Sequence, residues 1–382
     1  MVHTAPVRIA LVAGEASGDQ LGAALIRGLR QRYPSARFEG LGGPRMMAEG
    51  FHTLYSMERL AVMGLIEPLK RLPELIRLRQ CLRQHFLGWQ PAVVVGIDSP
   101  DFNLGLELQL RQAGLKTAHY VSPSVWAWRQ GRIRKIARAV DLMLTLLPFE
   151  AEFYRAHDVP VAYVGHPMAD ELPLSPDPGA ARRALSLTET APLIALLPGS
   201  RRSEVALLGP LFVEVARWCL RRCPELTFVL PAASVERRRE IDALLVAADD
   251  LPIKVVDGQS HAAMAAADVV LLASGTTALE AMLLKKPMVV AYKVGWLTHL
   301  LLSRLIKTPF VSLPNLLAGR ELVPEFLQDR ATVENLGASV LDYLQTPQKV
   351  TALCGQFLRL HQELRRGDAA VTAIAGLIET GR

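Results

Sequence analysis

An arginine follows a loop of small residues in the second half of the chain. The loop, Pro198-Gly199-Ser200, comes directly after the apolar run 193–197, and Arg201 opens the helical pattern that follows. A strand that enters a helix through such a loop directs free backbone N–H groups and the positive end of the helix dipole toward one point. Arg201 adds a permanent cation that suits phosphate oxygens. The pattern predicts a phosphate site.

A second loop of this kind follows the apolar run 269–272. Ser274, Gly275 and Thr276 could present N–H and hydroxyl donors to a diphosphate, and Glu280 comes one helical turn later. A carboxylate in that position can accept two hydrogen bonds from a ribose diol, as the acidic residue of dinucleotide sites does. The alternative is that Glu280 only complements the dipole at its helix end.

In the first half, Asp98 stands where the apolar run 92–97 ends. In open α/β sheets ligands bind outside the carboxyl ends of the strands, so an acid at this position is a candidate for proton transfer. The alternative is a helix cap, which Ser99 or Asp101 would supply better.

A third group of polar residues follows the run 7–13. Glu15, Ser17 and Asp19 come directly after Gly14 and open a helical pattern. They are candidates for substrate binding, and capping of that helix is again the alternative.

Strand-like apolar runs alternate with helical patterns in both halves, which is typical of parallel sheets covered by helices. Prolines, glycines and acids replace this pattern at 165–179, where we place a linker. We therefore expect an α/β protein with two doubly wound parallel sheets that face a central cleft. The expected domains are 1–168 and 169–350, with helices at 351–382 that pack back across the cleft.

The composition narrows the classes of ligand. The chain has 382 residues and a net charge of +6, which suits phosphorylated molecules or an anionic membrane. It contains no Asp-x-Asp triplet, no Gly-x-Gly-x-x-Gly after the first strand and no Gly-x-x-x-x-Gly-Lys, and its four cysteines are scattered. We therefore expect no metal ion and no cofactor. The amino-terminal residues lack a signal segment and no apolar run is long enough to span a bilayer, so a cytoplasmic protein is expected.

Three segments could contact lipid. Residues 65–83 form a basic amphipathic pattern, 126–138 combine tryptophan with arginine and lysine, and 294–306 are mostly apolar. The alternatives are that the first covers its own sheet, that the second binds nucleic acid, and that the third is buried. In the second segment the aromatic residues precede the basic run instead of alternating with it, which favours a membrane interface over nucleic acid.

Several longer motifs resemble those of the lipid-A-disaccharide synthase family. They are VAGEASGD at 12–19, LGGPR at 41–45, VMG at 62–64, HYVSPSVWAWR at 119–129, LPGSR at 197–201 and VSLPNLLAGRE at 311–321. They occur in the family's order from end to end of the chain.

The resemblance implies a metal-independent, inverting GT-B glycosyltransferase. Its substrates would be UDP-2,3-diacylglucosamine and 2,3-diacylglucosamine 1-phosphate, and its products a β-1,6-linked disaccharide and UDP. It implies residence at the cytoplasmic face of the inner membrane, on an anionic surface, with no nucleic acid as partner. Whether one protomer or a homodimer forms the working unit stays open.

The resemblance also assigns roles to the candidate residues. Asp98 would be the general base, although Asp101 or Glu15 could take the proton instead. Ser200 and Arg201 would bind the diphosphate, Ser274, Gly275, Thr276 and Glu280 the rest of the donor, and Asn315 would line the donor side. Glu15, Ser17 and Asp19 would face the acceptor. A UDP-sugar 2-epimerase and a non-catalytic lipid-binding protein are the alternative functions.

Overall fold

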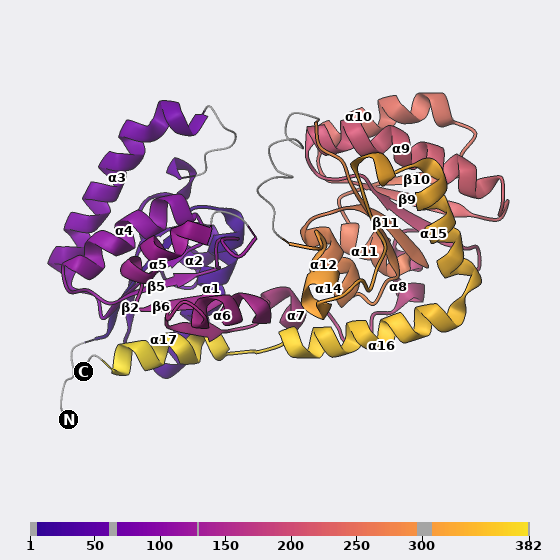
Figure 1. The fold of residues 1–382 in the computed structure, drawn as a ribbon. Coiled ribbons are helices and arrows are strands. Elements are labelled where there is room, and N and C mark those ends of the chain that lie inside the picture. The colour runs from indigo at the N-terminus through magenta and orange to yellow at the C-terminus, as the bar shows by residue number, and fades with distance from the viewer. Residues whose placement is uncertain (1–5, 61–66, 128–129, 296–307, 381–382) are drawn as a thin grey trace. The chain divides into compact units, whose positions relative to one another are not determined.

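A computed structural model describes residues 6–60, 67–127, 130–295 and 308–380, and for 67–71 the backbone alone. Contacts between Cα atoms divide the chain into two compact units (Figure 1). Unit 1 comprises Met1–Pro167 with Arg366–Arg382, and unit 2 comprises Met168–Arg365. The chain therefore passes between the units twice, at 167/168 and at 365/366.

Unit 1 is built on a parallel sheet with the strand order β3-β2-β1-β4-β5-β6-β7. The strands are β1 (Arg8–Ala13), β2 (Arg37–Gly42), β3 (His52–Ser56), β4 (Val93–Ile97), β5 (Thr117–Tyr120), β6 (Leu142–Thr145) and β7 (Val161–Tyr163). The helices are α1 (Ala16–Arg32), α2 (Pro44–Ala48), α3 (Glu67–Trp89), α4 (Pro100–Gln112), α5 (Ile133–Ala139), α6 (Pro148–Arg155) and α17 (Ala369–Glu379).

The central strands of unit 1 are buried on both faces because their side chains alternate between two cores. Ile9 and Leu11 pack with α1 and with Ile374 of α17, whereas Ala10 and Val12 pack with α3 and α4. The carboxyl-terminal helix thus belongs to the core of unit 1. The expected segment 351–382 is divided between the units, since α16 ends in unit 2 and α17 lies in unit 1.

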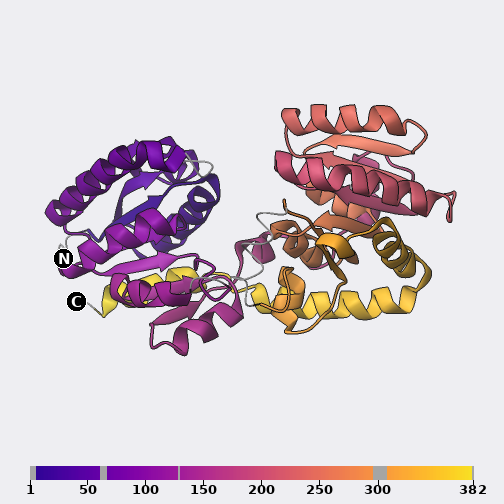
Figure 2. The same ribbon diagram turned by 45° about the horizontal axis from the view of Figure 1, so that its top comes forward.

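Unit 2 repeats this architecture with the strand order β10-β9-β8-β11-β12-β13, again all parallel. The strands are β8 (Leu193–Leu197), β9 (Thr227–Ala232), β10 (Ile253–Asp257), β11 (Val269–Ala273), β12 (Met288–Tyr292) and β13 (Glu325–Leu327). The helices are α7 (Pro167–Glu171), α8 (Pro178–Ala184), α9 (Arg202–Leu220), α10 (Val235–Leu245), α11 (Ser260–Ala266), α12 (Thr276–Leu283), α14 (Leu313–Ala318), α15 (Val333–Gln345) and α16 (Pro347–Leu364). Figure 2 shows helices on both sides of each sheet.

The sequence pattern anticipated two sheets and most of their strands. It missed β2, β3 and β13, which carry short or interrupted apolar runs. The expected linker at 165–179 contains α7 and the start of α8. Among the described residues, no helix is long and apolar enough to cross a membrane.

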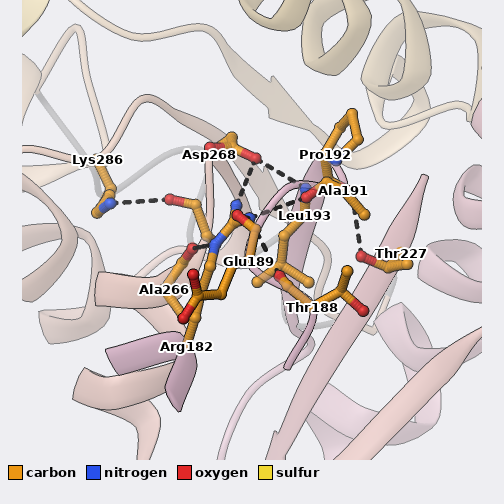
Figure 3. Close-up of polar contacts among 11 residues, drawn as sticks. Arg182, Thr188, Glu189, Ala191, Pro192, Leu193, Thr227, Ala266, Asp268 and Lys286 are labelled. Carbon is orange, nitrogen blue, oxygen red and sulfur yellow. Dashed lines mark hydrogen bonds and ion pairs between the residues drawn. The ribbon is translucent and has the colours of Figure 1, made fainter. Parts of the chain in front are cut away.

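A buried arginine ties together the amino ends of two strands in unit 2 (Figure 3). Arg182 of α8 donates to the carbonyl oxygens of Ala266 and of three residues in the loop 188–191. It also forms an ion pair of 2.9 Å with Asp268, whose Oδ2 accepts the backbone N–H of Leu193 as well. The start of β8 and the start of β11 are thereby held by one guanidinium.

We expect Arg182→Met to destabilise unit 2 strongly, because the buried carbonyl groups and Asp268 lose their partner. A buried acceptor left without its donor costs about 1–3 kcal/mol, and Arg182 serves several of them. The neighbouring Arg183, whose side chain is 62% exposed beside Glu189, supplies the control Arg183→Met. Urea unfolding of both variants measures the effect. Equal stability of the two variants would contradict the role of Arg182.

Candidate functional site

In unit 1 a cavity of about 370 Å³ lies at the carboxyl ends of β4 and β5. It contains the predicted base, Asp98, and its alternative, Asp101. The lining residues are Asp98, Pro100, Asp101, Val121, Ser122, Pro123, Ser124, Val125 and Arg132. The cavity is therefore formed by the turn after β4, the loop after β5 and the start of α5.

The backbone around this cavity is strained. Asp98, Ser99 and Val121 have φ angles of +54°, +45° and +81°, in the left-handed region that residues with a Cβ seldom adopt. The strain is held by tertiary contacts: Asn103 donates its side-chain amide to the carbonyl oxygens of Ile97 and Asp98. Strain of this kind clusters at functional sites, and here it coincides with a residue that lines the cavity, Asp98.

A buried acid–histidine pair lies in the same region and was missed in the sequence analysis. Glu107 Oε1 of α4 is 2.8 Å from His119 Nδ1 of β5, and both side chains are almost fully buried. A Cβ on Gly96 would lie 2.1 Å from Glu107 Oε1, so only glycine fits there. Both elements contain other polar residues, so residue type did not single out Glu107 and His119 in the sequence. The pair links α4 to β5 next to Gly96 of β4.

Asp101 is placed differently from Asp98. Its carboxylate is 89% exposed and forms an ion pair of 2.5 Å with Arg132. Asp98 and Asp101 line the same cavity, and the choice of Asp98 as the base stays a prediction.

The three predicted acceptor residues do not share one environment. Glu15 and Ser17 are exposed at the start of α1. Asp19 is 3% exposed, and its carboxylate accepts the backbone N–H groups of Gly43, Arg45 and Met46 at the start of α2. Asp19 therefore holds α2 in place, and its predicted contact with the acceptor stays a prediction.

In unit 2 the loop after β8 has the expected strand-loop-helix geometry, with an unexpected occupant. Glu204 Oε2 accepts the backbone N–H groups of Ser200 and Arg201, at 3.0 and 3.1 Å. Its Oε1 lies 2.9 Å from Arg201 Nη1. A carboxylate thus occupies the donors that the sequence assigned to phosphate, which shows that they can bind an anion. The signal for Glu204 was its position as an acid in the first helical turn.

Arg201 and Ser274 line one cavity of about 280 Å³, so the two predicted donor loops lie together. The cavity also includes Glu204 and Tyr292, and burial raises the pKa of the Tyr292 hydroxyl, with Glu204 adding to the effect. Ser274 donates its hydroxyl to the carbonyl of Val311 and its N–H to that of Ala291.

Gly275 and Thr276 are exposed at the start of α12, and Glu280 lies further along the same helix. The Glu280 carboxylate is 3.0 Å from His261 Nε2 of α11, and this hydrogen bond raises the pKa of His261. Glu280 keeps its second oxygen for another donor. Both the ribose contact and the helix-end charge remain interpretations of Glu280.

Asn315 is fully buried. Its Nδ2 donates to Val323 O and Glu325 Oε1, and its Oδ1 accepts the N–H groups of Leu322 and Val323. Glu325 also accepts the N–H groups of residues 311 and 312. Asn315 therefore holds the loops around α14, and its predicted contact with the donor requires this network to open.

A larger cavity, of about 850 Å³, lies at the amino ends of the unit 2 strands, on the opposite side from the cavity beside Arg201. It is lined by Arg182, Lys285 and Lys286 among others. Burial lowers the pKa of each lysine to about 8. The Lys285 ammonium lies beside three acceptors, Pro173 O, Leu283 O and His361 Nδ1, and that of Lys286 donates to Ala267 O. These contacts hold chain segments together at the amino ends of the strands.

The segments expected to contact lipid are described in part. On α3, Leu78, Leu82 and Phe86 are buried against the sheet, whereas Leu72 and Ile76 are 49% and 43% exposed. Trp128, Arg129 and most of 294–306 lie outside the described residues. Within the described part of the chain, no cluster of three or more histidine, cysteine or acidic residues has metal-binding geometry.

We expect Gly199→Ala to disrupt the loop after β8. Gly199 has φ +122°, and an added Cβ would lie 2.4 Å from Glu204 Cβ. The backbone strain alone costs about 1–3 kcal/mol, so stability should fall. Gly355→Ala, in the interior of α16 where nothing lies within 4 Å, should instead stabilise the protein by about 0.5–1 kcal/mol. Thermal unfolding tests this, and a Gly199→Ala variant that matches the wild type would refute it.

The comparisons with known proteins agree on one family. A family model described as lipid-A-disaccharide synthetase matches residues 9–374. The chain is 56% identical over 379 residues to a lipid-A-disaccharide synthase of Chromohalobacter salexigens, with 98% of each chain covered. It is 56% identical over 375 residues to that of Cellvibrio japonicus, again with 98% of each covered.

Solved structures share the fold. A putative UDP-N-acetylglucosamine 2-epimerase from Listeria monocytogenes superposes with a TM-score of 0.66 at 13% identity, covering 99% of this chain and 97% of that one. The calicheamicin glycosyltransferase superposes with a TM-score of 0.61 at 12% identity, covering 99% of each chain. The fold is GT-B, as the sequence indicated.

Proposed function

Because the chain belongs to the lipid-A-disaccharide synthetase family, and is thereby a glycosyltransferase that forms the disaccharide of lipid A, we propose its substrates and mechanism. It transfers 2,3-diacylglucosamine from the UDP donor to 2,3-diacylglucosamine 1-phosphate. The product is a β-1,6-linked disaccharide with UDP, formed with inversion and without a metal ion. Membership of this family argues against the two alternative functions, a UDP-sugar 2-epimerase and a non-catalytic lipid-binding protein.

The observation that carries the proposal for unit 1 is the placement of Asp98 in a cavity at a strained strand end. Asp98 takes the proton of the acceptor 6-hydroxyl as this oxygen attacks the anomeric carbon of the donor. The new bond forms on the face opposite the departing UDP, so the configuration inverts. The proton passes to the Asp98 carboxylate and the bonding electrons of the broken C–O bond leave with the diphosphate.

The departing UDP requires positive charge, which unit 2 supplies from the chain itself. Arg201 and the backbone N–H groups at the start of α9 receive the diphosphate in place of the Glu204 carboxylate, which turns away. Glu280 accepts hydrogen bonds from the ribose with its second oxygen while His261 holds the first. Ser274 and the start of α12 complete the donor site.

The lipid substrates require access to a membrane surface. The net charge of +6 and the exposed Leu72 and Ile76 on α3 support binding to an anionic bilayer from the cytoplasmic side. In this proposal the acyl chains stay near the bilayer while the sugars react.

We expect Asp98→Asn to lower kcat by about 10²- to 10⁴-fold, because a positioned general base contributes that much. Asp101→Asn, at the exposed carboxylate paired with Arg132, should lower it far less. Disaccharide formation is measured in detergent with EDTA present. If Asp98→Asn turned over at the wild-type rate, the base would be another residue, and if EDTA abolished turnover the metal-independent route would be wrong.

We expect Arg201→Ala to weaken UDP binding, since a charge-assisted hydrogen bond to phosphate is lost. The loss should be about 1.5–3 kcal/mol, on the order of tenfold or more in Kd. Arg202→Ala is the matched control, because the Arg202 side chain is 86% exposed and is directed toward Glu240. Isothermal titration with UDP decides between them, and equal affinities of both variants would remove Arg201 from the leaving-group site.

A further inference from the structure

One wall of the Asp98 cavity, residues 121–125, is held from behind by α6. Trp126 Nε1 donates to Glu150 Oε1 at 3.2 Å, and the Trp126 ring packs edge-on against Phe149 at 4.8 Å between centroids. At the other end of the wall, the hydroxyls of Ser122 and Tyr154 are 3.0 Å apart. The loop after β5 is therefore docked on a single face of one helix.

Glu150 is the central residue of this contact. Glu150 is only 5% exposed to solvent. Its second carboxylate oxygen, Oε2, accepts a hydrogen bond from the backbone N–H of Leu147 at 3.1 Å. One buried carboxylate thus joins the loop to the start of α6, with one oxygen for each. Because the wall begins at Val121, with φ +81°, it needs such contacts to keep its conformation.

We propose that Glu150 is a positioning residue of the transfer reaction, whose ionised carboxylate holds Trp126 and thereby keeps the 121–125 wall in the conformation that binds the acceptor beside Asp98. This inference rests on the proposed function, since it takes the Asp98 cavity as the acceptor site. Glu150 touches neither substrate in this role and acts through Trp126.

The charge of Glu150 changes near neutral pH. Burial raises the pKa of its carboxyl to about 7, although the hydrogen bonds from Leu147 and Trp126 oppose this. A proton on either oxygen weakens one of the two contacts, so the hold on the wall is complete only above about pH 7. The other ionisable groups nearby are Tyr154, whose pKa burial raises further above its usual value, and Arg132, which is paired with Asp101. The Tyr154 hydroxyl therefore keeps its proton across this pH range.

Protonation of Glu150 has opposite effects on the stability of the fold and on acceptor binding. The folded pKa of Glu150 lies above the unfolded value of about 4.3, so the folded chain binds the proton more tightly. The stability that this group contributes is therefore greatest at low pH and is lost as the pH rises through 7. Acceptor binding follows the opposite course and weakens as the pH falls through 7. A purely structural role would change stability without this opposite limb in activity.

The test compares the full-length wild type with Glu150→Gln and Glu152→Gln between pH 5.5 and 8.5. Glutamine keeps the size of the side chain but cannot ionise, so the variant resembles protonated Glu150. Glu152 is exposed on the same helix and serves as the control. We expect KM for the acceptor to rise below about pH 7 in the wild type and in Glu152→Gln. In Glu150→Gln it should be raised on the order of tenfold at every pH, with a smaller change in kcat. An unchanged pH limb in Glu150→Gln would overturn the proposal.

Trp126 gives a readout that does not depend on turnover. Its fluorescence in the wild type should change with a midpoint near pH 7, and this change should vanish in Glu150→Gln and in Trp126→Phe. If Glu150→Gln fails to fold, Trp126→Phe decides, because it removes the N–H donor and keeps an aromatic ring: a raised acceptor KM supports the proposal and an unchanged KM overturns it. If the wild type forms no disaccharide, the proposed function fails on its own. The fluorescence midpoint, present or absent, then still tests the hold of Glu150 on Trp126.

Discussion

Parallel strands that are buried on both faces carry few polar groups, because each buried polar group needs a partner, and the rest of this structure depends on that constraint. β4 in unit 1 and β8 and β11 in unit 2 are apolar from end to end, and β1 is apolar after its exposed first residue, Arg8. The candidate functional residues therefore lie at the ends of the strands. The candidate base, Asp98, the phosphate loop before Arg201 and the loop at Ser274 all lie at carboxyl ends, where backbone N–H groups and helix starts converge.

The two edges of the unit 2 sheet carry charge for different purposes. At the amino ends of the strands, Arg182 and Lys286 donate hydrogen bonds to backbone carbonyl oxygens and hold the starts of the strands together. At the carboxyl edge, Arg201 keeps an 80% exposed side chain with one internal carboxylate as its partner. The exposed cation is available to a ligand, whereas the buried ones stabilise the fold. The larger cavity at the amino edge is for this reason a weaker candidate for the reaction site than the smaller one beside Arg201.

The sequence predicted the two sheets, the family and the loops that carry Asp98, Arg201 and Ser274, because each of these depends on local patterns of apolar runs and small residues. It could not predict the partners of those residues, which come from distant parts of the chain. Asp19 and Asn315, which are predicted to contact the substrates, also make hydrogen bonds within their own units that the sequence did not indicate. Glu204 had a local signal as an acid in a first helical turn, whereas the contacts of Glu150 and of the Glu107–His119 pair join residues from different elements. Burial and hydrogen-bond saturation are tertiary properties, which residue type and spacing do not encode.

The central claim is that the carboxyl edge of the unit 2 sheet binds the nucleotide. Hydrogen exchange of backbone amides, with and without UDP, tests it most directly because it reports on both edges of the sheet at once. We expect slower exchange at 199–203 and 274–280, with the amides at 182–193 and 285–287 unchanged. Slower exchange confined to the segments around Arg182 and Lys286 would contradict it and would move the nucleotide to the cavity at the opposite edge.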